Sequence, residues 1–110
     1  NSTNTINGTY NITVYWGSGC LHCAKTINAL NDLGIKFNGK EIYGNLKNRR
    51  ELSNMYVRYN ITKDIGVPTI LIDNGNVSCL IIGELGTADW KLVLSKMSLL
   101  KPGACYSYDL

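Results

Sequence analysis

Apolar and polar positions follow two different rhythms along the chain, and the rhythms divide it into short strands and amphipathic helices. Compact β-prone runs at 12–16, 68–73 and 77–82 predict three strands. The segment 35–43 predicts another strand, although Gly39 weakens it because glycine offers no side chain to pack. The elements are therefore short, as expected for one small mixed sheet.

Three further segments carry apolar side chains at the spacing of a helix that is buried on one side. The first two are predicted at about 20–33, where Gly34 supplies the stop, and at about 46–59. Thr87 is expected to cap the third, which ends at 101–103. The three apolar stripes are Cys23, Ile27 and Leu30; Leu52, Met55, Tyr56 and Tyr59; and Trp90, Val93, Leu94 and Met97.

The resulting order is β-α-β-α-β-β-α. A parallel first βαβ unit is expected, and the turn sequence at 73–76 predicts an antiparallel hairpin between the last two strands. The fold class predicted is therefore α/β, a four-stranded mixed sheet flanked by helices on both faces. We expect residues 1–10 to be a polar linker, 11–100 the domain and 101–110 a C-terminal tail.

The composition excludes some classes of function but does not identify a single one. A chain of 110 residues suits a single domain, and 45% hydrophobic with 17% charged residues is ordinary for a globular protein. The net charge of +3 comes from scattered Lys and Arg residues, which gives no basis for nucleic-acid binding. No apolar run is long enough to span a membrane. The first residue is not Met and no signal peptide follows, so we expect a domain excised from a longer parent.

The chemistry concentrates in Cys20-Leu21-His22-Cys23, which follows the first strand and a Gly-Ser-Gly turn and opens the first helix. Free backbone N–H groups and the helix dipole at that place favour a thiolate, the nucleophile of thiol–disulfide exchange. His22 is either a spacer or a neighbour that further lowers the pKa of the Cys20 thiol, which would make the disulfide more oxidising. Half of a zinc site is the alternative for the two cysteines, and copper is another metal to consider.

Cys79 and Cys105 complete an even set of four cysteines. In an oxidising compartment they would bond to each other, linking the fourth strand, expected at a sheet edge, to the tail. A structural disulfide is the prediction, and a second redox pair that relays electrons is the alternative. Five Asn-x-Ser/Thr sequons also fit an extracytoplasmic location; they begin at Asn1, Asn7, Asn11, Asn60 and Asn76.

A Cys-x-x-Cys at the first helix, with Gly66-Val67-Pro68-Thr69 before a later strand, resembles the thioredoxin fold in its compact, glutaredoxin-like form. The segment 15–25 is similar to that of extracytoplasmic thioredoxin-like domains of archaea and bacteria. Some of those are tethered to membrane electron carriers of the cytochrome c biogenesis/DsbD type. The resemblance covers roughly residues 11–100.

The resemblance implies roles for individual residues. Cys20 would attack and Cys23 would resolve, Pro68 would follow a cis peptide bond, and the backbone of Val67 would pair with a substrate, with Trp16 also contacting it. Two features depart from the family: Leu21 stands where many relatives have proline, and a hydrophobic residue, Val14, falls near the family's buried aspartate. The proton route to the resolving thiol is left to Glu41, Glu84 or water.

The sequence therefore predicts a protein thiol–disulfide oxidoreductase domain outside the cytoplasm, membrane-anchored through its parent. Its partners would be protein dithiols or disulfides and a membrane-embedded electron carrier, and it would need no cofactor because the redox group is its own. Oxidase and reductase directions are both open. The alternative is a non-catalytic module of the same fold that binds copper or zinc through its cysteines.

Overall fold

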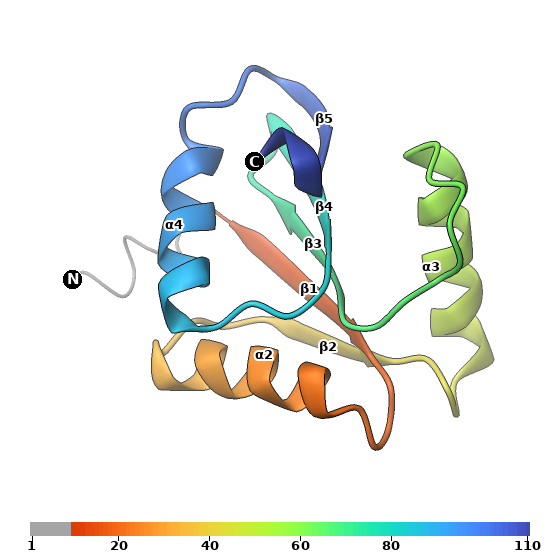
Figure 1. The fold of residues 1–110 in the computed structure, drawn as a ribbon. Coiled ribbons are helices and arrows are strands. Elements are labelled where there is room, and N and C mark those ends of the chain that lie inside the picture. Colours follow the sequence, from red (N-terminus) through yellow and green to blue (C-terminus); the bar gives the residue numbers. More distant parts are fainter. Residues whose placement is uncertain (1–9) are drawn as a thin grey trace.

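The protein, described by a computed structural model for residues 10–110, is a five-stranded mixed sheet with helices on both faces (Figure 1). The strand order is β2-β1-β3-β4-β5. The strands are β1 (Asn11–Trp16), β2 (Asn38–Glu41), β3 (Thr69–Asp73), β4 (Val77–Ile82) and β5 (Gly103–Tyr106). The helices are α2 (Leu21–Asp32), α3 (Leu46–Arg58), α4 (Thr87–Met97) and the short 3-10 helix η1 (Ser107–Asp109). Apart from Tyr10, the expected linker lies outside the described residues.

The predicted topology is confirmed for the first four strands. β1 pairs with β2 in parallel and with β3 antiparallel, and β3 and β4 form the expected antiparallel hairpin. The hairpin turns at Asn74 and Gly75, where Gly75 has a φ of 92° that an L side chain rarely adopts. The Asn74 carboxamide oxygen accepts from the backbone N–H groups of Asn76 and Val77, which fixes the turn.

The sheet has a fifth strand where the sequence predicted a tail. Residues 103–106 form β5, which pairs in parallel with β4 and is followed by η1. The chain reverses at Gly103, whose φ is 135°, and the Gly103 N–H donates to Asn76 O at 2.8 Å. β4 is consequently an inner strand, and the expectation that Cys79 lies at a sheet edge is wrong. Four residues are too few to show a strand periodicity, so pairing with β4 decides their structure.

Two element starts also differ from the prediction. β2 begins at Asn38 rather than 35, because Ile35 is buried in the turn after α2, its N–H bonded to Leu30 O at 3.0 Å. Gly86, not Thr87, is the N-cap of α4. The Gly86 N–H donates to the Asp89 carboxylate at 2.9 Å, so the first turn is capped from within the helix.

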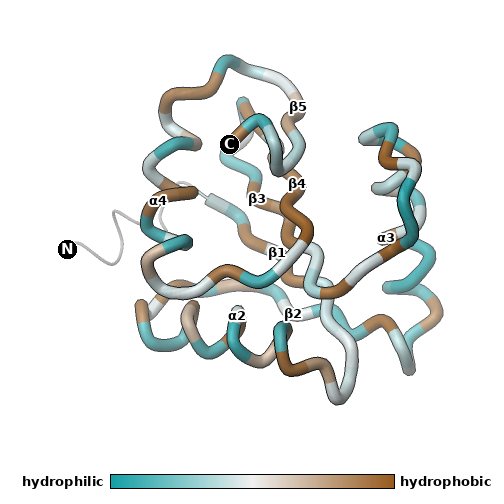
Figure 2. Tube along the Cα trace, in the orientation of Figure 1, coloured by the Kyte–Doolittle hydropathy of each residue, from teal (hydrophilic) through white to brown (hydrophobic). Residues whose placement is uncertain are grey.

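Two apolar clusters fill the space on the two faces of the sheet. α2 and α4 cover one face and α3 covers the other (Figure 1), with hydrophobic residues gathered along the central strands (Figure 2). The predicted helix stripes supply most of the helical share of both clusters, with Ile27, Tyr59 and Val93 only partly buried. Ala29 joins the cluster without having been predicted, and Cys23 is buried but belongs to neither cluster. The cluster under α2 and α4 includes Ile12, Val14, Leu30, Ile70, Ile72, Trp90 and Met97; the one under α3 includes Tyr15, Ile42, Leu52, Met55, Tyr56 and Leu80. This packing fixes the start of α2 at the end of β1.

Candidate active site

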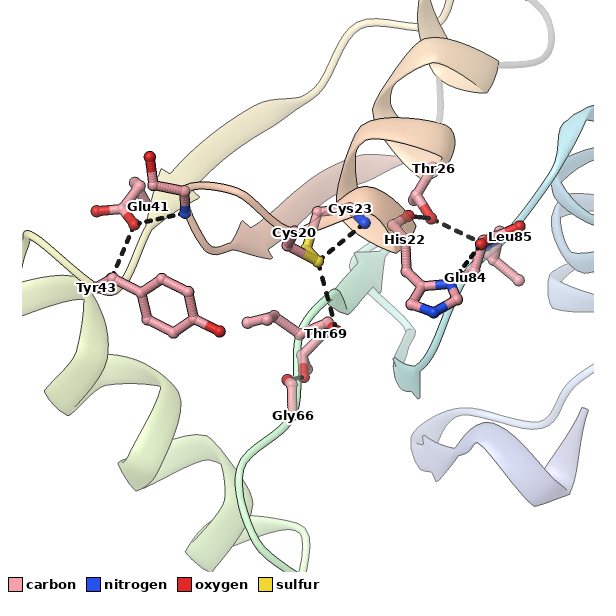
Figure 3. The surroundings of a disulfide bond; sticks show 12 residues. Cys20, His22, Cys23, Thr26, Glu41, Tyr43, Gly66, Thr69, Glu84 and Leu85 are labelled. Carbon is pink, nitrogen blue, oxygen red and sulfur yellow. Dashed lines mark hydrogen bonds and ion pairs between the residues drawn. A yellow bond between two sulfur atoms is a disulfide. The ribbon is translucent and has the colours of Figure 1, made fainter.

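Cys20 and Cys23 form a disulfide at the start of α2 (Figure 3). Cys20 is the N-cap residue with extended backbone angles, and its Sγ accepts from the Cys23 N–H at 3.1 Å. Cys20 is partly exposed, whereas Cys23, one turn into the helix, is 1% exposed. The sulfur that a partner can reach is therefore also the one that the helix N-terminus would stabilise as a thiolate.

The loop before Cys20 is held by a clamp from the β2–α3 connection. The Glu41 carboxylate accepts from the N–H groups of Ser18, Tyr43 and Gly44 at 3.1, 2.9 and 2.7 Å. The Gly44 N–H, followed by those of Tyr43 and Ser18, lowers the pKa of Glu41. The Tyr43 ring also packs on Gly17, where an added Cβ would lie only 2.2 Å from a ring carbon. A larger residue at Gly17 would therefore displace the Tyr43 ring.

The segment that leads into β3 also lies next to the disulfide. The peptide bond between Val67 and Pro68 is cis, the isomer expected from the resemblance. Cys20 Sγ lies 3.9 Å from the Val67 carbonyl oxygen, although the two residues are 47 positions apart. Pro68 is buried and Val67 is partly exposed. The fold thus brings together three of the residues singled out from the sequence.

A polar network that sequence reasoning missed anchors this loop to α3. The Tyr56 hydroxyl lies 2.9 Å from Thr69 Oγ1 and accepts from the Gly66 N–H at 3.1 Å. Thr69 in turn donates to Gly66 O at 2.6 Å. Tyr56 was assigned to the buried stripe, which is confirmed at 3% exposure. The sequence signal for the network was a tyrosine in a buried stripe, because a buried hydroxyl needs a hydrogen-bond partner.

His22 projects beside the disulfide and pairs with Glu84 from the β4–α4 loop, Nδ1 to Oε1, at 2.7 Å (Figure 3). Their side chains are 72% and 35% exposed. Glu84 was one of the carboxylates considered from the sequence, but nothing local predicted its contact with His22 because they are 62 positions apart.

Trp16 lies at the end of β1 and lines a hollow of about 370 Å³ together with Cys20, Leu21 and Cys23. It is partly buried and packs against the apolar cluster under α2 and α4. This places Trp16 near the disulfide. Contact with a substrate stays a prediction.

The other two cysteines are not part of this site. Cys79 and Cys105 are directly opposite each other in β4 and β5 and form the expected disulfide, with a Cα–Cα distance of 4.5 Å. They are 0% and 8% exposed. Within residues 10–110, no group of three or more His, Cys, Asp or Glu side chains is arranged to hold a metal ion.

The comparison that decides the family is a sequence match. The glutaredoxin family profile matches residues 12–77, which include both active-site cysteines and Pro68. The chain belongs to the glutaredoxin family. It has the thioredoxin-like fold, and its cysteine pair supports thiol–disulfide oxidoreductase activity in general.

Other comparisons add little detail to this glutaredoxin-family domain. The solved structure titled "Crystal structure of J-Trx1 fragment of ERdj5" is 12% identical, with a TM-score of 0.44. The match covers 87% of this chain and 45% of that one. No curated protein matches the chain. Among the described residues, no helix combines the length and apolar character needed to cross a membrane.

Proposed function

We propose that this domain exchanges disulfides with protein partners outside the cytoplasm, with Cys20 as the nucleophile and Cys23 as the resolving thiol. The observation that carries the proposal is the place of Cys20. It combines a helix N-terminus, partial exposure and a sulfur 3.9 Å from the Val67 carbonyl oxygen. The nucleophilic sulfur therefore lies next to a backbone segment that can pair with an extended partner chain.

Each turnover moves two electrons between the domain and its partner. In the reducing direction, the Cys20 thiolate attacks one sulfur of a partner disulfide, and the other partner sulfur leaves as a thiolate. Cys23 then loses its proton and attacks Cys20 Sγ, which forms the Cys20–Cys23 disulfide and releases the second partner thiol. The reverse sequence oxidises a partner dithiol. Because Cys23 is 1% exposed, it meets Cys20 rather than a second partner.

Docking of the partner is assigned to Val67, Pro68 and Trp16. The Val67 carbonyl oxygen lies 3.9 Å from Cys20 Sγ, and the Tyr56–Thr69 network holds that loop. Trp16 lines the hollow to which Cys20 and Cys23 also contribute. A partner segment would lie across Cys20 between these two groups, with its cysteine at the sulfur.

The proposed extracytoplasmic location is supported by the buried disulfide between Cys79 and Cys105, since such bonds persist in oxidising compartments. The described sequon residues Asn11, Asn60 and Asn76 are exposed, which is compatible with the same location. A membrane anchor in the parent and a membrane-embedded electron carrier as a partner rest on the resemblance alone. Measuring the reduction potential sets the direction: about −270 mV, as in thioredoxin, means reductase and about −120 mV means oxidase.

Trapping tests the proposal. A Cys23→Ser variant cannot resolve its intermediate, so it should hold partner proteins in mixed disulfides that dithiothreitol releases. Cys20→Ser is the matched control and should capture none. Equal capture by both variants, together with metal that survives chelation in the unmodified domain, would contradict the proposal and favour the metal-binding module.

A further inference from the structure

Leu21 places a large apolar side chain in water directly after the nucleophile, where it is 76% exposed. It lines, together with Trp16 and Ile27, the hollow of about 370 Å³ to which Cys20 and Cys23 also contribute. The described residues that line this hollow include no charged side chain. An apolar group that entered it would leave water without stripping a charge of its hydration. The hollow therefore favours an apolar occupant over a charged one.

The inner part of the hollow is anchored in the core, whereas its rim is open. Trp16 and Ile27 are partly buried and pack against the apolar cluster under α2 and α4. A Cβ added at Gly39 of β2 would lie 3.4 Å from Trp16 Nε1, so the indole rests on that strand. At the rim, Leu21 and Ala24 are exposed in the first turn of α2. The hollow is thus formed before a partner arrives, as ligand pockets usually are.

The exchange chemistry limits what can enter. A partner that is joined to Cys20 by a disulfide has its own cysteine at the hollow, because Cys20 is part of the wall. Consecutive Cα atoms are about 3.8 Å apart, so the residues that flank the partner's cysteine are the ones within reach. The Val67 carbonyl oxygen, 3.9 Å from Cys20 Sγ, faces the same partner segment and is assigned to its backbone. The hollow is left for one of its side chains.

We propose that this hollow is a specificity site for a large apolar side chain, such as leucine or phenylalanine, next to the reactive cysteine of the partner protein. The inference rests on the proposed function and adds the class of substrate. Burying such a side chain against Trp16, Leu21 and Ile27 removes apolar surface of both molecules from water. A polar side chain of similar size would lose hydration there without gaining a charged partner.

Peptides that differ in one residue test this selectivity. Each carries one cysteine as a mixed disulfide with thionitrobenzoate, with leucine or the similarly sized asparagine directly before the cysteine; a second pair places them directly after it. The Cys20 thiolate of the reduced domain attacks the peptide sulfur, and thionitrobenzoate leaves as a coloured thiolate that reports the rate. In at least one pair the leucine peptide should react about tenfold faster than the asparagine peptide.

The ratio of the two rates is the readout, since both peptides meet the same thiolate and release the same leaving group. A change in the reactivity of Cys20 therefore cancels. Leu21→Ser removes part of the rim and Ala24→Phe fills the hollow, and each should lower the ratio below about threefold. Leu92→Ser is the matched control and should keep the tenfold ratio. Leu92 is 55% exposed and lines another hollow, of about 230 Å³, whose described lining residues include no cysteine.

Equal rates for leucine and asparagine in both pairs, or a ratio that neither Leu21→Ser nor Ala24→Phe lowers, would overturn the specificity site. A concentration-dependent dimer in analytical ultracentrifugation that Leu21→Ser abolishes would assign the hollow to a second copy of the chain and would overturn it as well. If the reduced domain releases thionitrobenzoate from none of the peptides, the proposed function itself fails, so the two failures are distinguishable.

Discussion

Two disulfides of the same domain occupy opposite environments. Cys20 and Cys23 are 3 positions apart at the start of α2, with Cys20 partly exposed. Cys79 and Cys105 are 26 positions apart, lie opposite each other in β4 and β5, and are 0% and 8% exposed. At the helix start a backbone N–H points at the sulfur of Cys20.

The contrast shows that the position of a cysteine pair in the fold, rather than the residue type, separates a disulfide that exchanges with partners from one that only links two strands. A helix N-terminus offers unpaired N–H donors that stabilise a thiolate, whereas N–H groups in a sheet are used by the neighbouring strand. A thiol at Cys79 would also lose its solvation, which disfavours the thiolate. We therefore assign exchange to the first pair and the attachment of β5 to the second.

The largest expected effect comes from removing the exposed sulfur. In the Cys20→Ser variant, the rate at which insulin disulfides are reduced should fall to the uncatalysed rate, because the nucleophile is gone. The Cys79→Ala/Cys105→Ala variant should retain most of the activity, because its disulfide is remote from the exchange chemistry. If the second variant also falls to the uncatalysed rate while staying folded, that pair is an electron relay and the assignment is wrong.

Removing the buried pair should act on stability instead. A chain-entropy estimate for a loop of this length gives about 3.5 kcal/mol of lost free energy of unfolding. Urea denaturation of Cys79→Ala/Cys105→Ala, compared with the unmodified domain under non-reducing conditions, measures this loss. An unchanged unfolding midpoint would show that β5 needs no covalent link to β4.

A smaller effect should follow loss of the hydroxyl that anchors the cis-proline loop. Tyr56→Phe leaves the Gly66 N–H and Thr69 Oγ1 without this partner, which costs about 1 kcal/mol of stability. The loop that carries Val67 should then dock partners less well, so KM should rise more than kcat falls. Tyr59→Phe is the matched control, since that hydroxyl makes one long bond of 3.4 Å to Ser78 O. Equal kinetics in the two variants would exclude the docking role.

The smallest effect concerns the clamp on the loop before Cys20. The pKa of Glu41 is held below its ordinary 4.5 in the fold, mainly by the Gly44 N–H. The carboxylate therefore stabilises the folded state above pH 4.5, and this contribution is lost as the pH falls through the lowered value. Glu41→Gln should be less stable than the unmodified domain at neutral pH, with the difference shrinking below pH 4.5. Urea midpoints at several pH values measure it, and a difference independent of pH would contradict the clamp.

The parts of the molecule that follow from local pattern were predictable from the sequence. The start of α2 directly after Cys20, the stripe of α3 and the hairpin after β3 each have a signal within a few neighbouring residues. The cis bond at Pro68 was expected because the family motif surrounds it.

The parts that depend on contacts between distant residues could not be predicted. β5 is too short to show its own periodicity and exists because β4 pairs with it. Tyr56 was assigned by spacing to a helical face and Thr26 was not singled out at all, because spacing does not say which distant N–H group a buried hydroxyl will meet. Glu41 likewise showed no local sign that it would bind two loops.

The most direct test of the contrast is a graded reduction of the native domain followed by alkylation and peptide mapping. Increasing dithiothreitol should open Cys20–Cys23 first, with iodoacetamide labelling Cys20 before Cys23, while Cys79 and Cys105 stay unlabelled until the domain unfolds. Opening of Cys79–Cys105 at the lower dithiothreitol concentration, or preferential labelling of Cys23, would contradict the account.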